Sequence, residues 1–119
     1  GDTLKAGSSQ IPPIDGGSGN TNTSMTPGTA AFGMDIPSAD ASLFIPYCYR
    51  GDGTPTGFYC MYDQGASGGI TSAYGTDIIS GTGPLNTALA TLTFAATAAQ
   101  DTPAGEYSAI ISLIATATF

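Results

Sequence analysis

The chain contains no histidine and no tryptophan, and its only basic residues are Lys5 and Arg50. Histidine is the commonest general base and metal-binding side chain, and lysine is the usual amine nucleophile. A serine–histidine pair therefore cannot be assembled, which disfavours a small hydrolase. We expect a protein without enzymatic activity, without a cofactor and without a metal site.

Charge of either sign is scarce, and positive charge is almost absent. Only 9% of the residues are charged, against about 25% in a typical soluble protein, and the net charge is −7. No cationic face exists to displace counterions from nucleic acid or to bind an anionic membrane surface. The chain also lacks an apolar run of about 18 residues. We therefore expect neither nucleic-acid binding nor membrane insertion.

The chain has no initiator methionine and no apolar run of the signal-peptide kind. This favours the mature form of an exported protein, although an artificial start at Gly1 would look the same. The 119 residues include 17 glycines and 8 prolines, with many Thr and Ser. By length they form one domain. We expect a secreted, extracellular protein of the cell surface.

The last stretch of the chain carries the clearest pattern. From Tyr107 to Phe119 every second residue is apolar. This is the period of a β-strand with one face on a core. The apolar positions are Tyr107, Ala109, Ile111, Leu113, Ala115, Ala117 and Phe119.

Turn residues divide the rest of the chain into short segments with strand composition, as in β-sandwiches and barrels. We predict one all-β domain over 29–119, an immunoglobulin-like antiparallel sandwich of about seven strands. An extended Gly/Ser/Pro/Thr-rich arm over 1–28 precedes it. The predicted strands are Thr29–Met34, Ala41–Arg50, Phe58–Asp63, Ile70–Tyr74, Asp77–Ser80, Leu89–Ala98 and Glu106–Phe119.

The segment Leu89–Ala98 is rich in alanine but alternates Thr with apolar residues. Because Thr is β-branched, we predict a strand rather than a helix. Pro103 and Gly105 are expected to turn this strand into the last one as a hairpin. The inward faces of that hairpin should bury Leu92, Phe94, Tyr107, Ile111 and Leu113.

The arm over 1–28 is of low complexity and cannot bury enough apolar area to offset its ordering entropy alone. It contains Leu4 and Ile11, however. One interpretation is a disordered linker. The other is a strand donated to another copy, in which Leu4 and Ile11 fill pockets and copies join head to tail. Asn22 begins a glycosylation sequon, a pattern that chance produces easily in Thr/Ser-rich sequence.

The only two cysteines are Cys48 and Cys60. If their flanking segments pair as a hairpin, the cysteines face each other within disulfide distance. An exported protein favours a disulfide over two buried thiols. Two thiolates without histidine do not complete a metal site.

Tyrosines gather around the same predicted hairpin. Cross-strand packing explains them, and a glycan-stacking surface is the alternative. Arg50-Gly51-Asp52 lies at the tip, as an ordinary turn in Gly- and Asp-rich sequence would. No group of carboxylates has the spacing of a known calcium loop. The tyrosines are Tyr47, Tyr49, Tyr59 and Tyr62.

The stretch Thr102-Pro103-Ala104-Gly105-Glu106-Tyr107-Ser108 and the alternation after it resemble the closing strands of secreted prokaryotic β-sandwich domains. The similar families are WxL-type surface domains, spore-coat-U-like domains and fimbrial subunits, over about Leu89–Phe119. The tryptophan of true WxL domains is absent.

The resemblance implies a structural cell-surface protein or a pilus or filament subunit. In fimbrial subunits, an N-terminal arm from the next subunit completes the sandwich by strand addition. We therefore expect a homo-oligomer of head-to-tail copies. The alternative is a secreted carbohydrate-binding module that uses the tyrosine-rich hairpin, with glycans as its partners.

Overall fold

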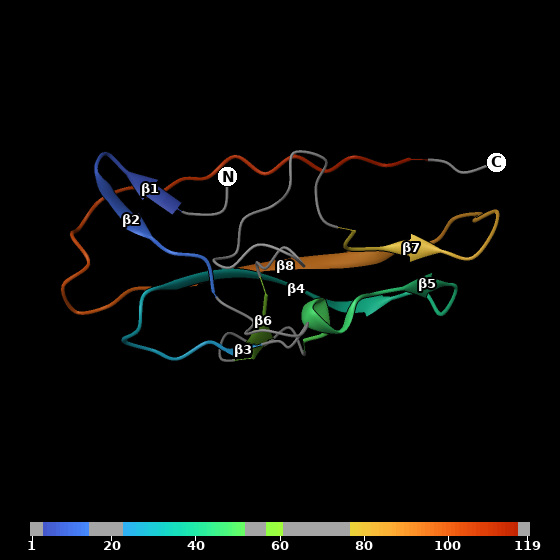
Figure 1. Ribbon diagram of the computed structural model, residues 1–119, viewed down its shortest axis with the longest axis horizontal. Helices are drawn as coiled ribbons and strands as arrows, with labels where there is room; N and C mark the ends of the chain where they lie inside the picture. Colours follow the sequence, from blue (N-terminus) through green and yellow to red (C-terminus); the bar gives the residue numbers. More distant parts are fainter. Residues whose placement is uncertain (1–3, 15–22, 52–56, 61–76, 117–119) are drawn as a thin grey trace.

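The strands pair two by two in the computed structural model (Figure 1), and all those described are two or three residues long except β4 and β8, which have nine and eight. The structure describes residues 4–14, 23–51, 57–60 and 77–116. All four ladders are antiparallel: β1 with β2, β3 with β6, β4 with β8 and β5 with β7. The predicted all-β class is confirmed. The elements are β1 (Leu4–Ala6), β2 (Ser9–Ile11), β3 (Thr23–Ser24), β4 (Ala31–Ala39), β5 (Leu43–Phe44), the 3-10 helix η1 (Tyr47–Tyr49), β6 (Phe58–Tyr59), β7 (Ser80–Gly81) and β8 (Ala90–Thr97).

The strand β4 is the centre of the fold. Its first six residues are all buried, so both of its faces are covered, as in a strand inside a layered core. One edge pairs with β8, from Ala31 opposite Thr97 to Ala39 opposite Ala90. The other edge bridges to Pro13 through Phe32 and to Cys60 through Met34.

A bulge interrupts β4 where the sequence places a proline. The register with β8 shifts between Asp35 and Ser38, which leaves one extra residue on the β4 side. Pro37 lies inside this shift. Proline has no N–H to give to a ladder, and bulges are among the few places where a sheet tolerates it. The bulge lets β4 run past the predicted end at Met34.

The buried core is built from residues between Ile11 and Cys60, and so it includes part of the predicted arm. Ile11, Ile14 and Met25 are buried in the same apolar cluster as β4. Phe32 of this cluster stacks on Phe94 of β8, with ring centroids 6.4 Å apart. The described arm residues are therefore folded onto the domain. The buried apolar residues are Ile11, Ile14, Met25, Ala31, Phe32, Met34, Ile36, Ile45, Cys48, Tyr49 and Cys60.

The arm begins with a hairpin, formed by β1 and β2, which we call the N-terminal hairpin. Its two-residue loop is Gly7-Ser8, and Gly7 has a φ of +60°. Glycine at the first loop position is typical of the type II′ turn, which matches the twist of hairpin strands. After the hairpin, residues 12–14 run along β4: Phe32 donates to the Pro12 carbonyl and Ile14 donates to that of Phe32.

The predicted cysteine hairpin is wrong in its geometry. The expected strand Ala41–Arg50 ends at Phe44, and the chain then forms η1. Pro46, with a φ of −55°, precedes this helix. Its ring cannot donate to a ladder and its φ suits a helical turn, so the strand cannot continue. The strand β6 pairs with β3 instead.

Of the predicted strands in the second half of the chain, one is confirmed and another lies at a shifted position. The strand Leu89–Ala98 is confirmed as β8, and the strand expected over Asp77–Ser80 lies at Ser80–Gly81 as β7. The strand expected over Ile70–Tyr74 falls outside the described residues.

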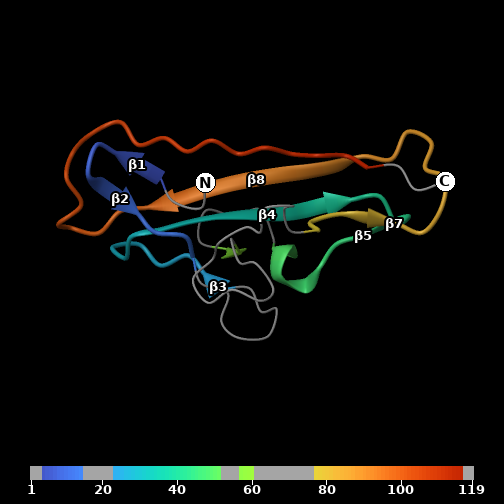
Figure 2. The same ribbon diagram turned by 45° about the horizontal axis from the view of Figure 1, so that its top comes forward.

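The strand predicted over Glu106–Phe119 is not formed by its described residues, 106–116, and so its predicted hairpin with β8 does not form either. Residues 106–116, here called the C-terminal segment, run back along β8 (Figures 1 and 2). Within the described part of the chain their one backbone bridge joins Ser108 to Lys5. The reason lies in the connection. A turn from Ala99 to Thr102, closed by hydrogen bonds of 3.1 and 2.9 Å, and then Pro103 make a wide loop.

The side chains of this predicted hairpin are less buried than expected. Leu92 and Tyr107 are partly buried, but Phe94, Ile111 and Leu113 are 43%, 39% and 63% exposed. No residue of β8 is buried. Without backbone pairing between β8 and the C-terminal segment, the two do not close over their apolar faces.

Candidate functional site

The site is the C-terminal segment together with the apolar hollow beside it. Its base is fixed by Tyr107, whose hydroxyl donates a 2.9 Å hydrogen bond to the carbonyl of Pro103. A tyrosine hydroxyl bonded to backbone a few residues upstream is the tyrosine corner of β-sandwich proteins. The corner gives the stretch Thr102-Pro103-Ala104-Gly105-Glu106-Tyr107 its structural role. It sets the direction in which the C-terminal segment leaves the loop.

The corner can be tested by removing one oxygen atom. Tyr107→Phe deletes the hydrogen bond to Pro103 and keeps the ring, so the free energy of unfolding should fall by about 0.5–1.5 kcal/mol. Urea denaturation measures the change. Tyr47→Phe is the control, because the exposed Tyr47 hydroxyl makes no hydrogen bond to any described residue. Equal stability of the two variants would contradict the corner.

The C-terminal segment presents one backbone edge that is only partly used. Lys5 donates to the carbonyl of Ser108 at 2.9 Å, and Ser108 donates to that of Lys5 at 3.0 Å. In an extended strand, backbone groups return to the same edge at every second residue. The edge bound by Lys5 therefore continues at Ile110, Ser112 and Ile114. These three have no backbone partner among the residues that the structure describes.

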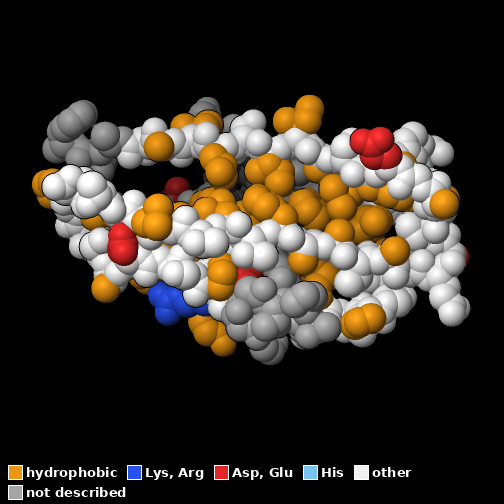
Figure 3. Space-filling view, turned by 180° about the vertical axis from the view of Figure 1, so that it is seen from behind, with side chains coloured by type: hydrophobic (Ala, Val, Ile, Leu, Met, Phe, Trp, Pro, Cys, Tyr) orange, Lys and Arg blue, Asp and Glu red, His pale blue; other side chains and the backbone are white. Residues whose placement is uncertain are grey.

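The same segment leaves large apolar side chains in solvent. Ile110, Leu113 and Ile114 are 86%, 63% and 78% exposed. Ile111, at 39%, is the least exposed of the described large apolar side chains after Tyr107. Figure 3 shows hydrophobic side chains gathered in a hollow below the rim that this segment forms. A segment that exposes unpaired backbone groups and apolar side chains in this way invites pairing with another chain.

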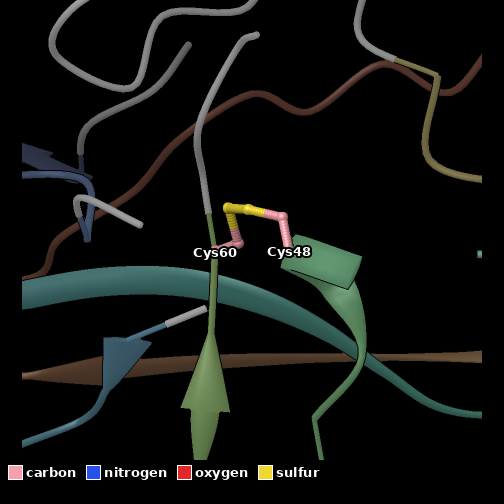
Figure 4. The surroundings of a disulfide bond; sticks show 2 residues. All are labelled: Cys48 and Cys60. Carbon is pink, nitrogen blue, oxygen red and sulfur yellow. A yellow bond between two sulfur atoms is a disulfide. The ribbon is translucent and has the colours of Figure 1, made fainter. Parts of the chain in front are cut away.

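Away from this edge, Cys48 and Cys60 form a disulfide (Figure 4), with Cα atoms 5.5 Å apart. Both cysteines are buried. The bond ties η1 to the end of β6, and Cys60 exchanges two 2.9 Å backbone hydrogen bonds with Met34 of β4. The disulfide therefore anchors η1 to the central strand.

A buried carboxylate holds the loop after η1. Asp35 of β4 is fully buried, and its Oδ1 accepts a 3.0 Å hydrogen bond from the N–H of Gly51. Arg50 donates from Nε to the carbonyl of Ile45 at 2.7 Å, and its Cζ lies 5.5 Å from the centre of the Phe44 ring. The first two residues of Arg50-Gly51-Asp52 are thus held by the protein itself. The sequence signal for Asp35 was a lone acid in the otherwise uncharged run from Ala31 to Ile36.

The predicted tyrosine surface is not brought together. Tyr47 is exposed while Tyr49, on the same short helix, is buried. The side chain of Tyr59 and the whole of Tyr62 lie outside the described residues, as does the sequon residue Asn22. The structure therefore supports no stacking platform made from Tyr47 and Tyr49.

The predicted assembly residues lie in the N-terminal hairpin. Leu4 begins β1 and is partly buried, while Ile11 ends β2 and is buried.

In the part of the chain that the structure describes, no group of three or more acidic, cysteine or histidine residues could hold a metal ion. The described residues also include no helix long and apolar enough to cross a membrane.

These features define a class: an all-β protein, tied by one disulfide, with a C-terminal segment that exposes apolar side chains and makes one backbone bridge within the described structure. Comparisons of the chain with protein-family models, curated proteins and solved structures gave no match. The functional argument therefore depends on the geometry of the edge.

Proposed function

We propose that this is a non-enzymatic extracellular structural protein, a cell-surface or filament subunit that assembles head to tail by strand addition. Its ladders are parts of an immunoglobulin-like sandwich of about seven strands that an added strand completes. The observation that carries the proposal is the C-terminal segment, whose backbone edge beyond Ser108 is unpaired within the described structure and whose Ile110 and Ile114 are exposed.

The energetics of one added strand suit reversible assembly. Three or four new backbone hydrogen bonds contribute about 0.5–1.5 kcal/mol each. Burying Ile110, Leu113 and Ile114 contributes roughly 1.5–3 kcal/mol for each side chain. The total is comparable to the 4–15 kcal/mol that association costs. Assembly should therefore depend on protein concentration.

The partner that fits best is a second copy of the chain. The N-terminal hairpin already pairs with this edge at Lys5 and Ser108, so its strands are compatible with it in backbone and side chains. Donor and acceptor are different surfaces, so the contact can repeat into a fibre rather than close as a dimer. The net charge of −7 keeps the remaining surface soluble.

The proposal is tested by removing one backbone donor from the edge. Ser112→Pro deletes an N–H on the edge that Lys5 uses, and proline cannot donate to a ladder. Filaments seen by negative-stain microscopy and sedimentation should be lost. Ser112 is exposed and has no described backbone partner, so the monomer should keep its fold.

The matched control is Ala115→Pro, which deletes an N–H on the opposite edge of the same segment. It should assemble as the wild type does. Strand addition at this edge is wrong if Ser112→Pro forms the same filaments. It is equally wrong if the wild type stays monomeric at every concentration.

A further inference from the structure

We propose that the N-terminal hairpin is an autoinhibitory latch. This inference depends on the proposed strand addition and states how it is regulated. In the free subunit, one intrachain contact covers the start of the accepting edge and also withholds the strand that would be donated. Assembly therefore requires the hairpin to leave its own domain before it can pair with the next copy.

The hairpin covers the start of the C-terminal segment, which is the surface that would accept an added strand. Lys5 takes both backbone groups of Ser108, on the same edge that continues at Ile110 and Ser112. The hairpin also packs closely on the loop before the segment, since a Cβ built at Gly105 would lie 3.5 Å from that of Ala6. A partner strand that pairs along the whole edge must displace β1, because a backbone group on one edge serves one neighbour.

The N-terminal hairpin, which would be donated to another copy, is packed on its own domain in the free subunit. Leu4 is partly buried against the core and Ile11 is buried within it. The hairpin is followed directly by the anchored stretch in which Ile14 donates to the carbonyl of Phe32 at 2.7 Å. The apolar side chains that would fill a neighbour's pockets are thus already in use.

Few backbone contacts hold the hairpin to the C-terminal segment. Each of its strands has three residues, and one residue pair, Lys5 with Ser108, bonds its backbone to the described part of the C-terminal segment. Local units of a few residues open at lower free energy than a whole domain, and opening this one requires Ile11 to leave the core. A tethered strand nevertheless competes at an effective concentration on the order of millimolar. Free subunits should therefore show a lag before they assemble.

A disulfide across the contact locks the latch. Lys5 and Ser108 form a hydrogen-bonded antiparallel pair, whose Cα atoms lie about 5.5 Å apart, within the range that a disulfide spans. The variant Lys5→Cys with Ser108→Cys is oxidised, and the two single variants are alkylated as controls. The probe is a labelled synthetic peptide with the sequence of residues 3–14, and its binding is followed by fluorescence anisotropy. The locked protein should bind it at least tenfold more weakly than either control.

A second variant opens the latch without touching the core. Gly7 has a φ of +60°, and a Cβ added there would meet nothing within 4 Å. Gly7→Ala therefore acts only through backbone strain in the hairpin turn. Peptide binding should be several-fold faster and the assembly lag shorter. Ser8→Ala, at the next position of the same turn, is the matched control and should behave as the wild type.

The results separate the latch from the proposed function. Equal peptide binding to the locked protein and the alkylated controls would overturn the latch and leave strand addition standing. An unchanged binding rate in Gly7→Ala would also overturn it. If no variant binds the peptide and the wild type forms no filaments, both the latch and strand addition are wrong.

Discussion

Replacing Cys48 with alanine should lower the free energy of unfolding by about 2–5 kcal/mol. The bond spans 12 residues, and closing a loop of this size restricts the unfolded chain by roughly 3 kcal/mol in the chain-entropy model. The substitution also leaves the buried Cys60 without its covalent partner beside β4. Urea denaturation followed by circular dichroism gives the value.

The control is the double variant Cys48→Ala with Cys60→Ala. Because the bond is already lost in the single variant, the second substitution should cost much less than the first. Alkylation of the unreduced wild type, followed by intact mass, should find no free thiol. A single variant within about 0.5 kcal/mol of the wild type would show that the bond does not stabilise the fold.

Phe32→Ala should be the most damaging substitution in β4, with a loss of about 3–5 kcal/mol. The Phe32 ring is buried, stacks on Phe94 and belongs to the strand that is paired on both edges. Deleting it leaves a cavity at the centre of the fold. Thermal and urea unfolding of the monomer measure the loss.

Ile114→Ala is the comparison, because Ile114 is 78% exposed. Its effect on monomer stability should stay within about 0.5 kcal/mol, while its assembly should weaken. A similar loss of stability in both variants would mean that the C-terminal segment packs into the core of the free subunit.

The sequence predicted those features that depend only on the residues of the feature itself. The alternation of Thr with apolar residues predicted β8, and the two cysteines predicted their bond. The central role of β4 was missed because Gly33, Asp35 and Pro37 interrupt its apolar pattern. A strand buried on both faces shows no alternation to recognise.

Partners in the fold were harder to predict than elements. The ladder of β4 with β8 joins Ala31 to Thr97, far apart in sequence, and nothing local to either strand specifies the other. Alternation after Tyr107 predicted a strand with an inward side, but the described residues 106–116 form no strand, and Leu113 on the predicted inward side is 63% exposed. The alternation could not show that the segment lacks a neighbour, because period two reports the faces of a strand and not the use of its edges.

The disulfide has a mechanical consequence for a subunit that carries tension. Force applied through the two ends of the chain passes across the Cys48–Cys60 bond and bypasses the residues between them. Those 12 residue steps, about 40 Å of extended chain at 3.3–3.6 Å per residue, stay closed even when the rest of the domain is drawn out. In the proposed fibre, the added strands that would hold one copy to the next carry no such covalent bond. Under load, a fibre of these subunits would therefore separate at its joints while the ring around the loop after η1 remained intact.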